Sequence, residues 1–269
     1  MQQEKQYLWE TGKVPYFCTE YGQEEPAITP FLLDNGRKNG CVIVCPGGGY
    51  ACRMESYEGA EIAQWLNQNG ISAVLLHYRV HPYQYPAMTE DVQRAVRYVR
   101  YRAGDWSIDP EKVGVIGFSA GGHLASTTAY CFDRGREDGD AVDRFSSRPD
   151  AVLLCYAVLT MGRYADRGTH DNFLKGLPEE HELERAFSAE CAVREDAPPC
   201  FLFHTQDDSC VPVQNSLMMY ETLTEKGVRS ELHIFPCGDH GVGLGASVPG
   251  TCQWPTLAVD FLKRQGFVR

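Results

Sequence analysis

Short apolar runs alternate with segments of helical periodicity along most of this chain, and this alternation restricts the folds open to it. The apolar runs are nearly continuous in hydrophobic residues, which is typical of strands covered on both faces. They are residues 41–45, 71–77, 113–117, 151–156, 199–204 and 231–235. The segments of helical period are residues 58–69, 88–102, 120–131, 213–226 and 256–265. The pattern predicts an α/β fold in which helices flank a mostly parallel central sheet.

Two segments interrupt the alternation. Residues 132–150 are rich in charge, and we expect a mobile excursion there. Residues 160–198 lie between two predicted strands, and an insertion of that length is usually functional, so we expect a cap or a substrate wall. No linker divides the chain, and one α/β domain can take up all 269 residues. We therefore expect residues 1–269 to form a single domain.

The helical segment 88–102 carries an apolar stripe of valines and alanines that recurs with a helical period, so that side should face the sheet. Arg94, Arg97 and Arg100 fall on the opposite side of the helix. We expect these three arginines to form a solvated face.

The composition excludes several classes of partner. The chain has 36 acidic and 25 basic side chains, a net charge of −11 and no clustered basic face, which argues against nucleic acid. No apolar run approaches the roughly 18 residues of a membrane span, and residues 1–10 lack the apolar core of a signal peptide, so we expect no membrane association. The 11 cysteines form no CxxC pair. They favour a reduced, cytoplasmic chain over a disulfide scaffold or a zinc cluster.

A candidate nucleophile stands between a predicted strand and a predicted helix. Residues 117–121 read GFSAG, which matches the pattern G-x-S-x-G with Ser119 at its centre. This strand–turn–helix setting is the one that a nucleophile elbow requires. Small neighbours are needed because the turn is sharp, and the amino end of the following helix favours developing negative charge. The alternative is a glycine-rich turn in which Ser119 merely caps the helix.

A loop of three consecutive glycines follows the first predicted strand. Residues 46–50 read PGGGY, and glycines at such a position provide bare amides or let another segment approach closely. Beside a nucleophile elbow, such a loop contributes to an oxyanion hole together with the amide after the nucleophile, here that of Ala120. A phosphate cradle is excluded, because neither GxGxxG nor GxxxxGK followed by Ser or Thr can be found here. A plain flexible turn is the other alternative.

A serine nucleophile needs a general base, and histidine suits that role near neutral pH. Of the eight histidines, His240 stands in a glycine-rich loop directly after the last predicted strand, where the order serine, acid, histidine places the base. The acid should follow the preceding strand, and Asp207 and Asp208 both occupy that place. The spacing to the next helix favours Asp208, with Asp207 as the alternative. No histidine spacing matches a zinc site, so we expect no metal.

These motifs together resemble those of the α/β-hydrolase superfamily, and more closely its esterase branch of acetyl-xylan esterases and feruloyl-esterase-like proteins. The resemblance covers about residues 28–265 and is carried by residues 46–50, 61–80, 108–126, 157–176, 201–216 and 231–245. It implies an α/β-hydrolase fold with an insertion between the strands near 151–156 and 199–204. The site residues that it implies are Ser119 as nucleophile, Asp208 as acid, His240 as base, and the amides of Gly48, Gly49 and Ala120 as the oxyanion hole.

The resemblance further implies a serine carboxylic-ester hydrolase that acts through an acyl-enzyme and needs no cofactor. The expected substrate is a small-molecule ester of an acylated carbohydrate, such as an acetylated sugar or xylo-oligosaccharide. The alternatives are an amide-directed hydrolase with the same residues, such as an arylformamidase or small peptidase, and a general short-chain carboxylesterase. A non-catalytic binding protein of this fold is disfavoured, because the serine, acid and histidine positions are all filled.

Overall fold

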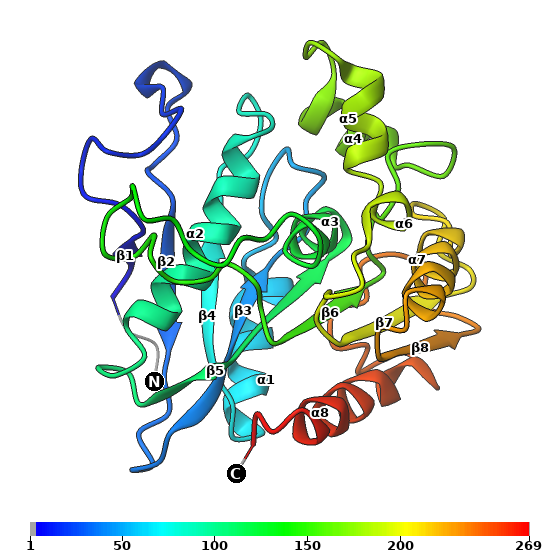
Figure 1. Ribbon diagram of the computed structural model, residues 1–269. Coiled ribbons are helices and arrows are strands. Elements are labelled where there is room, and N and C mark those ends of the chain that lie inside the picture. Colours follow the sequence, from blue (N-terminus) through cyan, green and yellow to red (C-terminus); the bar gives the residue numbers. More distant parts are fainter. Residues whose placement is uncertain (1–3, 269) are drawn as a thin grey trace.

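A computed structural model describes residues 4–268 and contains an eight-stranded sheet (Figure 1). The strand order across the sheet is β1-β2-β4-β3-β5-β6-β7-β8. The strands are β1 (Gln6–Tyr7), β2 (Ala27–Phe31), β3 (Asn39–Cys45), β4 (Ser72–His77), β5 (Ile108–Phe118), β6 (Ala151–Cys155), β7 (Cys200–Thr205) and β8 (Ser230–Phe235). From β4 to β8 all pairs are parallel, whereas β1 and β2 add an antiparallel edge. The predicted α/β-hydrolase architecture with a mostly parallel sheet is confirmed.

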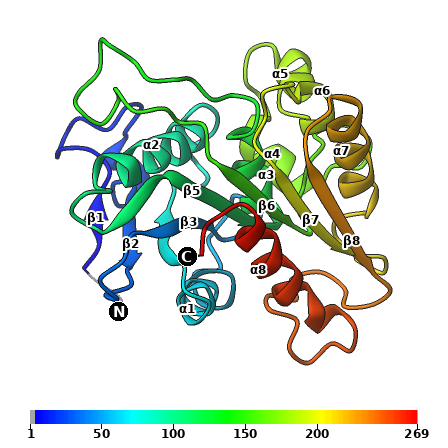
Figure 2. The ribbon, with the colours of Figure 1, turned by 60° about the horizontal axis from the view of Figure 1, so that its bottom comes forward.

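Helices cover both faces of this sheet. They are α1 (Glu61–Gln68), α2 (Ala87–Tyr101), α3 (Ser119–Thr127), α4 (Arg167–Leu174), α5 (Glu180–Ala186), α6 (Ala189–Ala192), α7 (Gln214–Glu225) and α8 (Trp254–Arg264). Shorter helical turns are η1 (Thr19–Tyr21), η2 (Ser56–Ala60) and η3 (Thr251–Gln253). Helices α1 and α8 lie on one face, and α2, α3 and α7 lie on the other (Figure 2). Between residues 4 and 268, no helix has the length and apolar character that a membrane crossing requires.

Strand β3 shows why the predicted strands are apolar throughout. Ile43 belongs to the apolar cluster that packs against α2, α3 and α7, whereas Val42 and Val44 belong to the cluster that packs against α1 and α8. Successive side chains of a strand point to opposite faces, so a strand covered on both sides has no polar position.

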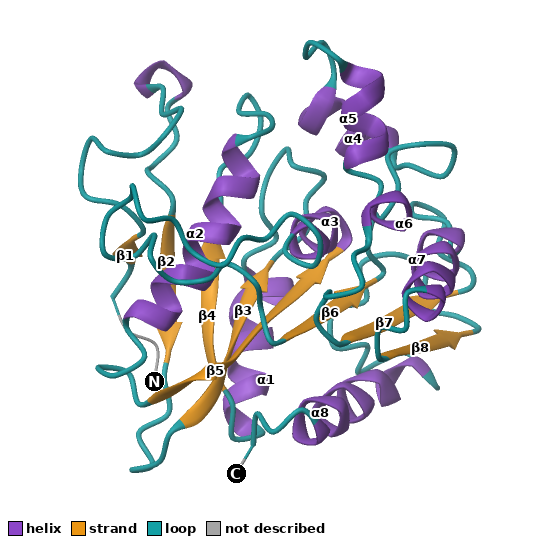
Figure 3. Cartoon of the chain, viewed as in Figure 1, coloured by secondary structure: helices purple, strands orange, loops and turns teal. Residues whose placement is uncertain are grey.

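The predicted insertion between the strands near 151–156 and 199–204 is confirmed. It contains α4, α5 and α6, joined by loops, between β6 and β7 (Figure 3). In Figure 1, α4 and α5 stand beyond the end of the sheet at which the parallel strands finish. The insertion therefore lies on the side where loops after parallel strands gather.

Strand β2 was not among the predicted strands, and its sequence, AITPF, explains the omission. Pro30 has no N–H to donate, and a proline within a run argues against a central strand. Here β1 pairs only with Ala27 and Ile28, so the part of β2 that carries Pro30 is a sheet edge on that side. A proline is tolerated at such an edge.

The expectation that Arg94, Arg97 and Arg100 form a solvated face is wrong. The side chains of Arg94 and Arg97 are only 3% and 1% exposed, and that of Arg100 is 9% exposed. The charged segment 132–150 runs over α2 in both views (Figures 1 and 2). Carboxylates of that segment or at its end pair with each guanidinium: Asp140 and Asp143 with Arg94, Asp133 with Arg97, and Asp150 with Arg100.

Candidate active site

Ser119 stands at the junction of β5 and α3 on a turn with a strained backbone. Its φ is +52°, in the left-handed region that residues other than glycine seldom occupy. A Cβ atom on Gly117 would lie 2.1 Å from the carbonyl oxygen of Gly121. A Cβ atom on Gly121 would lie 2.2 Å from the carbonyl oxygens of Cys45 and Pro46. Close backbone contacts therefore require both glycines of the motif, and the turn holds Ser119 at the carboxyl edge of the sheet.

The structure brings Ser119, His240 and Asp208 into one hydrogen-bonded chain. His240 follows β8, and Asp208 follows β7. Ser119 Oγ lies 2.8 Å from His240 Nε2, and His240 Nδ1 lies 2.8 Å from Asp208 Oδ2. An ionised carboxylate can only accept, so His240 donates its Nδ1–H to Asp208 and accepts from the Ser119 hydroxyl at Nε2. This tautomer is the one in which an imidazole can take a proton from a serine.

Asp208 is buried in a setting that favours its ionised form. Its Oδ1 accepts hydrogen bonds from the amides of Cys210 and Val211, at 3.0 and 2.7 Å. His204 Nε2 lies 3.3 Å from Oδ2, the oxygen that also faces His240. Burial opposes ionisation, but the hydrogen bonds from His204, His240 and the Val211 amide outweigh it and hold the pKa of Asp208 well below its usual range. Asp208 can therefore stabilise a positive charge on His240.

Asp207 faces a different partner from its neighbour. Its two oxygens accept from the amides of Asp239, at 2.9 Å, and Gly238, at 3.2 Å. Asp239 in turn accepts from the amide and hydroxyl of Ser209, at 3.0 and 2.7 Å. Asp207 thus braces the loop that carries His240, and it is Asp208 whose carboxylate meets the imidazole.

The loop with the three glycines passes beside this chain of hydrogen bonds. Gly48 and Gly49 have φ values of +126° and +62°, and a Cβ on Gly48 would lie 2.4 Å from the Cys52 carbonyl oxygen. Within residues 4–268, the amides of Gly48 and Gly49 donate to no protein acceptor. The amide of Ala120 belongs to the first turn of α3, where no intrahelical acceptor is available. These three N–H groups remain free to bind a ligand oxygen.

Helix α4 of the insertion also contacts the loop with the three glycines. Asn172 Nδ2 donates to the carbonyl oxygen of Gly49, at 2.9 Å. The rings of Phe173 and Tyr50 stack, with centroids 5.1 Å apart and planes inclined by 18°. The insertion is therefore in direct contact with the glycine loop.

Glu58 is a further residue of the site, and it joins the glycine loop to the histidine loop. Its side chain is buried and accepts from the amide of Gly47, at 2.8 Å, and from the hydroxyl of Tyr156, at 2.7 Å. The Tyr156 oxygen also accepts from the amide of Gly243, at 3.1 Å, in the loop after His240. The ring of Tyr156 meets the imidazole of His240 edge to face, with centroids 5.1 Å apart. Burial raises the pKa of Glu58, while the two donors partly offset this effect.

Sequence reasoning placed Glu58 only as the first residue of a predicted helix. Its partner Tyr156 lies 98 residues away, at the end of β6. A buried carboxylate at a helix start carries no local pattern that separates it from an exposed one, so the sequence gives no signal for this pair.

Among the described residues, one group has the geometry to hold a metal ion. His170, Glu180 and Glu184 of the insertion offer ligand atoms that lie within 4.8 Å of one another. Both nitrogens of His170 already face carboxylates, however: Nδ1 is 3.0 Å from Asp171 and Nε2 is 2.9 Å from Glu184. The group is thus satisfied as a buried histidine between two acids.

The chain is similar to known proteins over most of its length. The BD-FAE family model matches residues 32–223. The chain is 35% identical over 244 residues to endo-1,4-beta-xylanase B of Butyrivibrio fibrisolvens, covering 88% of this chain and 38% of that protein. It is 31% identical over 253 residues to the acetylxylan esterase of Xylanibacter ruminicola, covering 88% of this chain and 50% of that protein. The chain thus spans half or less of the length of these two curated relatives.

Solved structures with a similar fold cover almost the entire chain. The acetyl ester-xyloside bifunctional hydrolase from Caldicellulosiruptor lactoaceticus superposes with a TM-score of 0.95 at 41% identity, covering 99% of this chain and 97% of that one. A sugar hydrolase from Lactococcus lactis superposes with a TM-score of 0.73 at 28% identity, covering 90% of this chain and 95% of that one.

Proposed function

Because this chain belongs to the BD-FAE family of α/β-hydrolases, we propose that it is a serine carboxylic-ester hydrolase that removes acetyl groups from xylan-type sugars. The observation that carries the proposal is the chain of two 2.8 Å hydrogen bonds from Ser119 through His240 to Asp208. An arrangement of this kind turns a serine hydroxyl into a nucleophile.

In the proposed reaction, Ser119 Oγ attacks the ester carbonyl carbon while His240 Nε2 takes the hydroxyl proton. Asp208 stays ionised and stabilises the imidazolium. The amides of Gly48, Gly49 and Ala120 bind the oxygen on which negative charge develops. The C–O bond to the sugar then breaks, and the sugar leaves as its alcohol with the proton from His240. Water next attacks the acetyl carbonyl while His240 takes a proton from it, the bond to Ser119 Oγ breaks, His240 returns the proton to Ser119, and acetate leaves.

The choice of substrate rests on two kinds of support. The relatives at 31% to 41% identity are named as a xylanase, an acetylxylan esterase and an acetyl ester-xyloside hydrolase. The net charge of −11 favours an uncharged ester over an anionic one. An acetylated xylo-oligosaccharide is uncharged and carries an ester that this mechanism can cleave.

The test compares Ser119→Ala with the unaltered protein on p-nitrophenyl acetate and on acetylated xylo-oligosaccharides. We expect kcat to fall by about 10³-fold or more in the variant. Ser126→Ala in the same helix is the matched control, because the Ser126 hydroxyl donates to the His123 carbonyl oxygen within α3, at 2.7 Å, and is no part of the hydrogen-bonded chain of Ser119, His240 and Asp208. Full activity of Ser119→Ala, or failure of a fluorophosphonate to label Ser119, would refute the proposal.

A panel of esters tests the alternatives. We expect acetyl esters to be cleaved faster than butyryl and octanoyl esters, and acetylated sugars faster than formanilides. Faster cleavage of formanilides would favour an amide-directed hydrolase, and indifference to the leaving group would favour a general short-chain carboxylesterase.

We also propose that residues 1–269 act as one domain in a reducing, cytoplasmic compartment. One sheet supplies the loops that bear Ser119, Asp208 and His240. All 11 cysteines are free thiols, and several are buried in the core. A single cooperative unfolding transition, and recovery of activity with the cytoplasmic fraction, are the expected results.

A further inference from the structure

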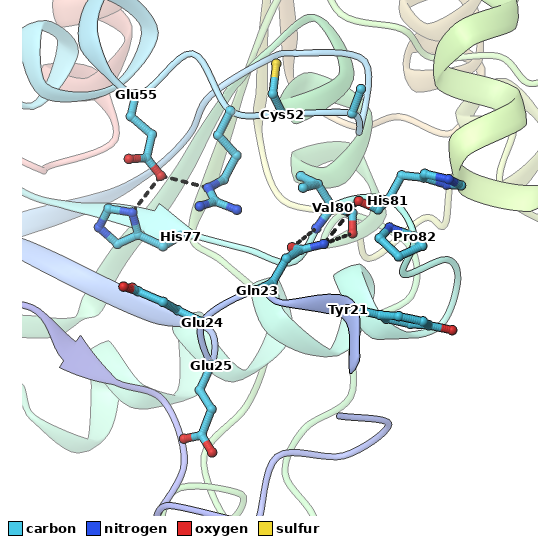
Figure 4. Close-up of a pocket in the computed structure, with 12 residues that line it drawn as sticks. Tyr21, Gln23, Glu24, Glu25, Cys52, Glu55, His77, Val80, His81 and Pro82 are labelled. Carbon is cyan, nitrogen blue, oxygen red and sulfur yellow. Dashed lines mark hydrogen bonds and ion pairs between the residues drawn. The ribbon is translucent and has the colours of Figure 1, made fainter. Parts of the chain in front are cut away.

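A polar cleft of about 450 Å³ lies beside the glycine loop and is not used by the proposed reaction (Figure 4). Three segments and one strand residue line it. The segments are residues 21–25, which precede β2, residues 51–55, which follow the glycine loop, and residues 80–82, which follow β4; the strand residue is His77, the last of β4. Because β3, β4 and β5 are parallel, the segments after β3 and β4 open on the same edge of the sheet as Ser119.

One wall of this cleft is the back of the oxyanion turn. The amides of Ala51 and Cys52 both donate to the Gly48 carbonyl oxygen, at 3.0 and 3.1 Å, which closes a tight turn. Ala51 and Cys52 line the cleft, whereas Gly48 and Gly49 carry the free amides. A single turn of chain therefore separates the cleft from the place where the ester oxygen would bind.

The opposite wall is held in place before any ligand arrives. The side chain of Gln23 accepts from the Val80 amide at 3.1 Å and donates to the carbonyl oxygens of Val80 and His81, at 2.8 and 3.1 Å (Figure 4). The ring of Tyr21 packs edge to face on Tyr83, with centroids 4.9 Å apart. A preformed wall loses little conformational entropy on binding.

The chemistry of the lining selects the class of ligand. Tyr21 is 44% exposed and offers a flat, rigid ring at the rim of the cleft. Glu24, Glu25 and Glu55 supply carboxylate acceptors, with Arg53 as the cationic donor. Lys5 lies 2.7 Å from Glu24, so three carboxylates stand against two cations and the lining keeps a net negative charge that repels anions. Carboxylate acceptors beside an aromatic ring suit a neutral ligand with many hydroxyl groups.

The carboxylate of Glu55 keeps its charge. Arg53 Nε and His77 Nδ1 each lie 2.7 Å from Glu55 Oε1 (Figure 4). The hydrogen bond from His77 has the largest effect and, against the opposing effect of burial, lowers the pKa of Glu55 to about 2. Its second oxygen remains available to a hydroxyl group of a ligand.

We propose that this cleft binds neutral pyranose units of the substrate chain beyond the acetylated sugar, with Tyr21 as the residue on which a sugar ring packs. This inference rests on the proposed function, since it extends the same site. It makes the protein selective for acetylated oligosaccharides over acetylated single sugars.

The test measures Tyr21→Ala against p-nitrophenyl acetate, which carries no sugar unit, and against acetylated xylopentaose. We expect kcat/KM for the pentasaccharide to fall about three- to tenfold, mainly through KM, with no change for p-nitrophenyl acetate. Tyr7→Ala is the control, because Tyr7 is a tyrosine of similar exposure, 50%, on β1 and outside the cleft. It should leave both substrates unaffected.

A binding measurement separates this inference from the proposed function. Calorimetric titration of Ser119→Ala with unacetylated xylopentaose should show binding that the additional change Tyr21→Ala weakens by a similar factor. If the unaltered protein fails to hydrolyse p-nitrophenyl acetate, the proposed function is wrong. If it hydrolyses that ester but Tyr21→Ala affects both substrates equally or neither, the cleft is not a sugar subsite. Binding of Ca²⁺ without binding of xylopentaose would also overturn the inference.

Discussion

Glu58→Gln is expected to slow turnover while leaving substrate binding nearly unchanged. The carboxylate of Glu58 accepts hydrogen bonds from both the Gly47 amide, at 2.8 Å, and the Tyr156 hydroxyl, at 2.7 Å. One of these donors belongs to the glycine loop, and the other belongs to the residue whose ring packs on His240. The substitution keeps the size of the side chain but replaces one acceptor oxygen with an NH₂ group.

The magnitude follows from that change of acceptor. A glutamine can accept from only one of the two donors, so the other becomes a buried unpaired group, which costs about 1–3 kcal/mol. Loss of the negative charge on Glu58 has two effects of opposite sign on the transition state. It removes an attraction to the imidazolium of His240, and it removes a repulsion of the oxyanion. The two effects of charge oppose each other, so the loss of one acceptor determines the result. When the activation free energy rises by that 1–3 kcal/mol, kcat falls about 5- to 150-fold.

The assay is steady-state hydrolysis of p-nitrophenyl acetate, with kcat and KM determined separately. Glu61→Gln is the matched control, because Glu61 is an exposed glutamate at the start of α1 and should leave kcat unchanged. Tyr156→Phe should lower kcat too, and the double variant should lose less than the sum of the two effects, because both act through one network. A variant with reduced thermal stability but unaltered kcat would show that Glu58 serves the fold alone and would refute the reasoning.

Three further outcomes are expected. Asp208→Asn should lower kcat by about 10³–10⁴-fold and Asp207→Asn by less than about tenfold, so equal losses in the two variants would contradict the different partners of these carboxylates. Burial lowers the pKa of His123 to about 4 from 6.5, so the unfolded chain binds a proton that the folded chain does not. The free energy of unfolding should therefore fall by up to about 3 kcal/mol as the pH drops from 6.5 to 4. In urea unfolding, the free energy of unfolding should depend less on pH in His123→Gln than in the unaltered protein, and an identical pH dependence would contradict this. Arg94→Met should reduce stability by about 1–3 kcal/mol in urea unfolding, whereas Lys263→Met at an exposed pair should change it by less than about 0.5 kcal/mol.

The sheet could be predicted because buried parallel strands carry their signal in composition. The run 41–45 is apolar at every position, and β3 buries both of its faces. The contacts of Arg94 could not be predicted in the same way. Helical periodicity predicts which side of α2 faces the sheet, but it does not predict that the charged segment 132–150 folds back over the other side.

In the candidate site too, residues with a local sequence pattern could be predicted and residues defined by distant contacts could not. Ser119 and His240 each stand in a local pattern, a motif between strand and helix or a glycine-rich loop after the last strand, so the sequence identifies them as candidates. The choice between Asp207 and Asp208 depends on which carboxylate the turn directs towards the imidazole, and spacing alone only favours one. No local pattern identifies Glu58, because its place in the site depends on its hydrogen bond with Tyr156, which is distant in sequence.

The hydrogen bond from Asn172 to the Gly49 carbonyl oxygen constrains how this scaffold can diversify. Connecting segments that shape binding sites vary more between related proteins than the helices and strands that they connect. Here the exchangeable segment also supports the backbone that would bind the oxyanion. A transplanted insertion changes the rate of the chemical step along with the choice of substrate, unless it brings its own side-chain donor for that carbonyl.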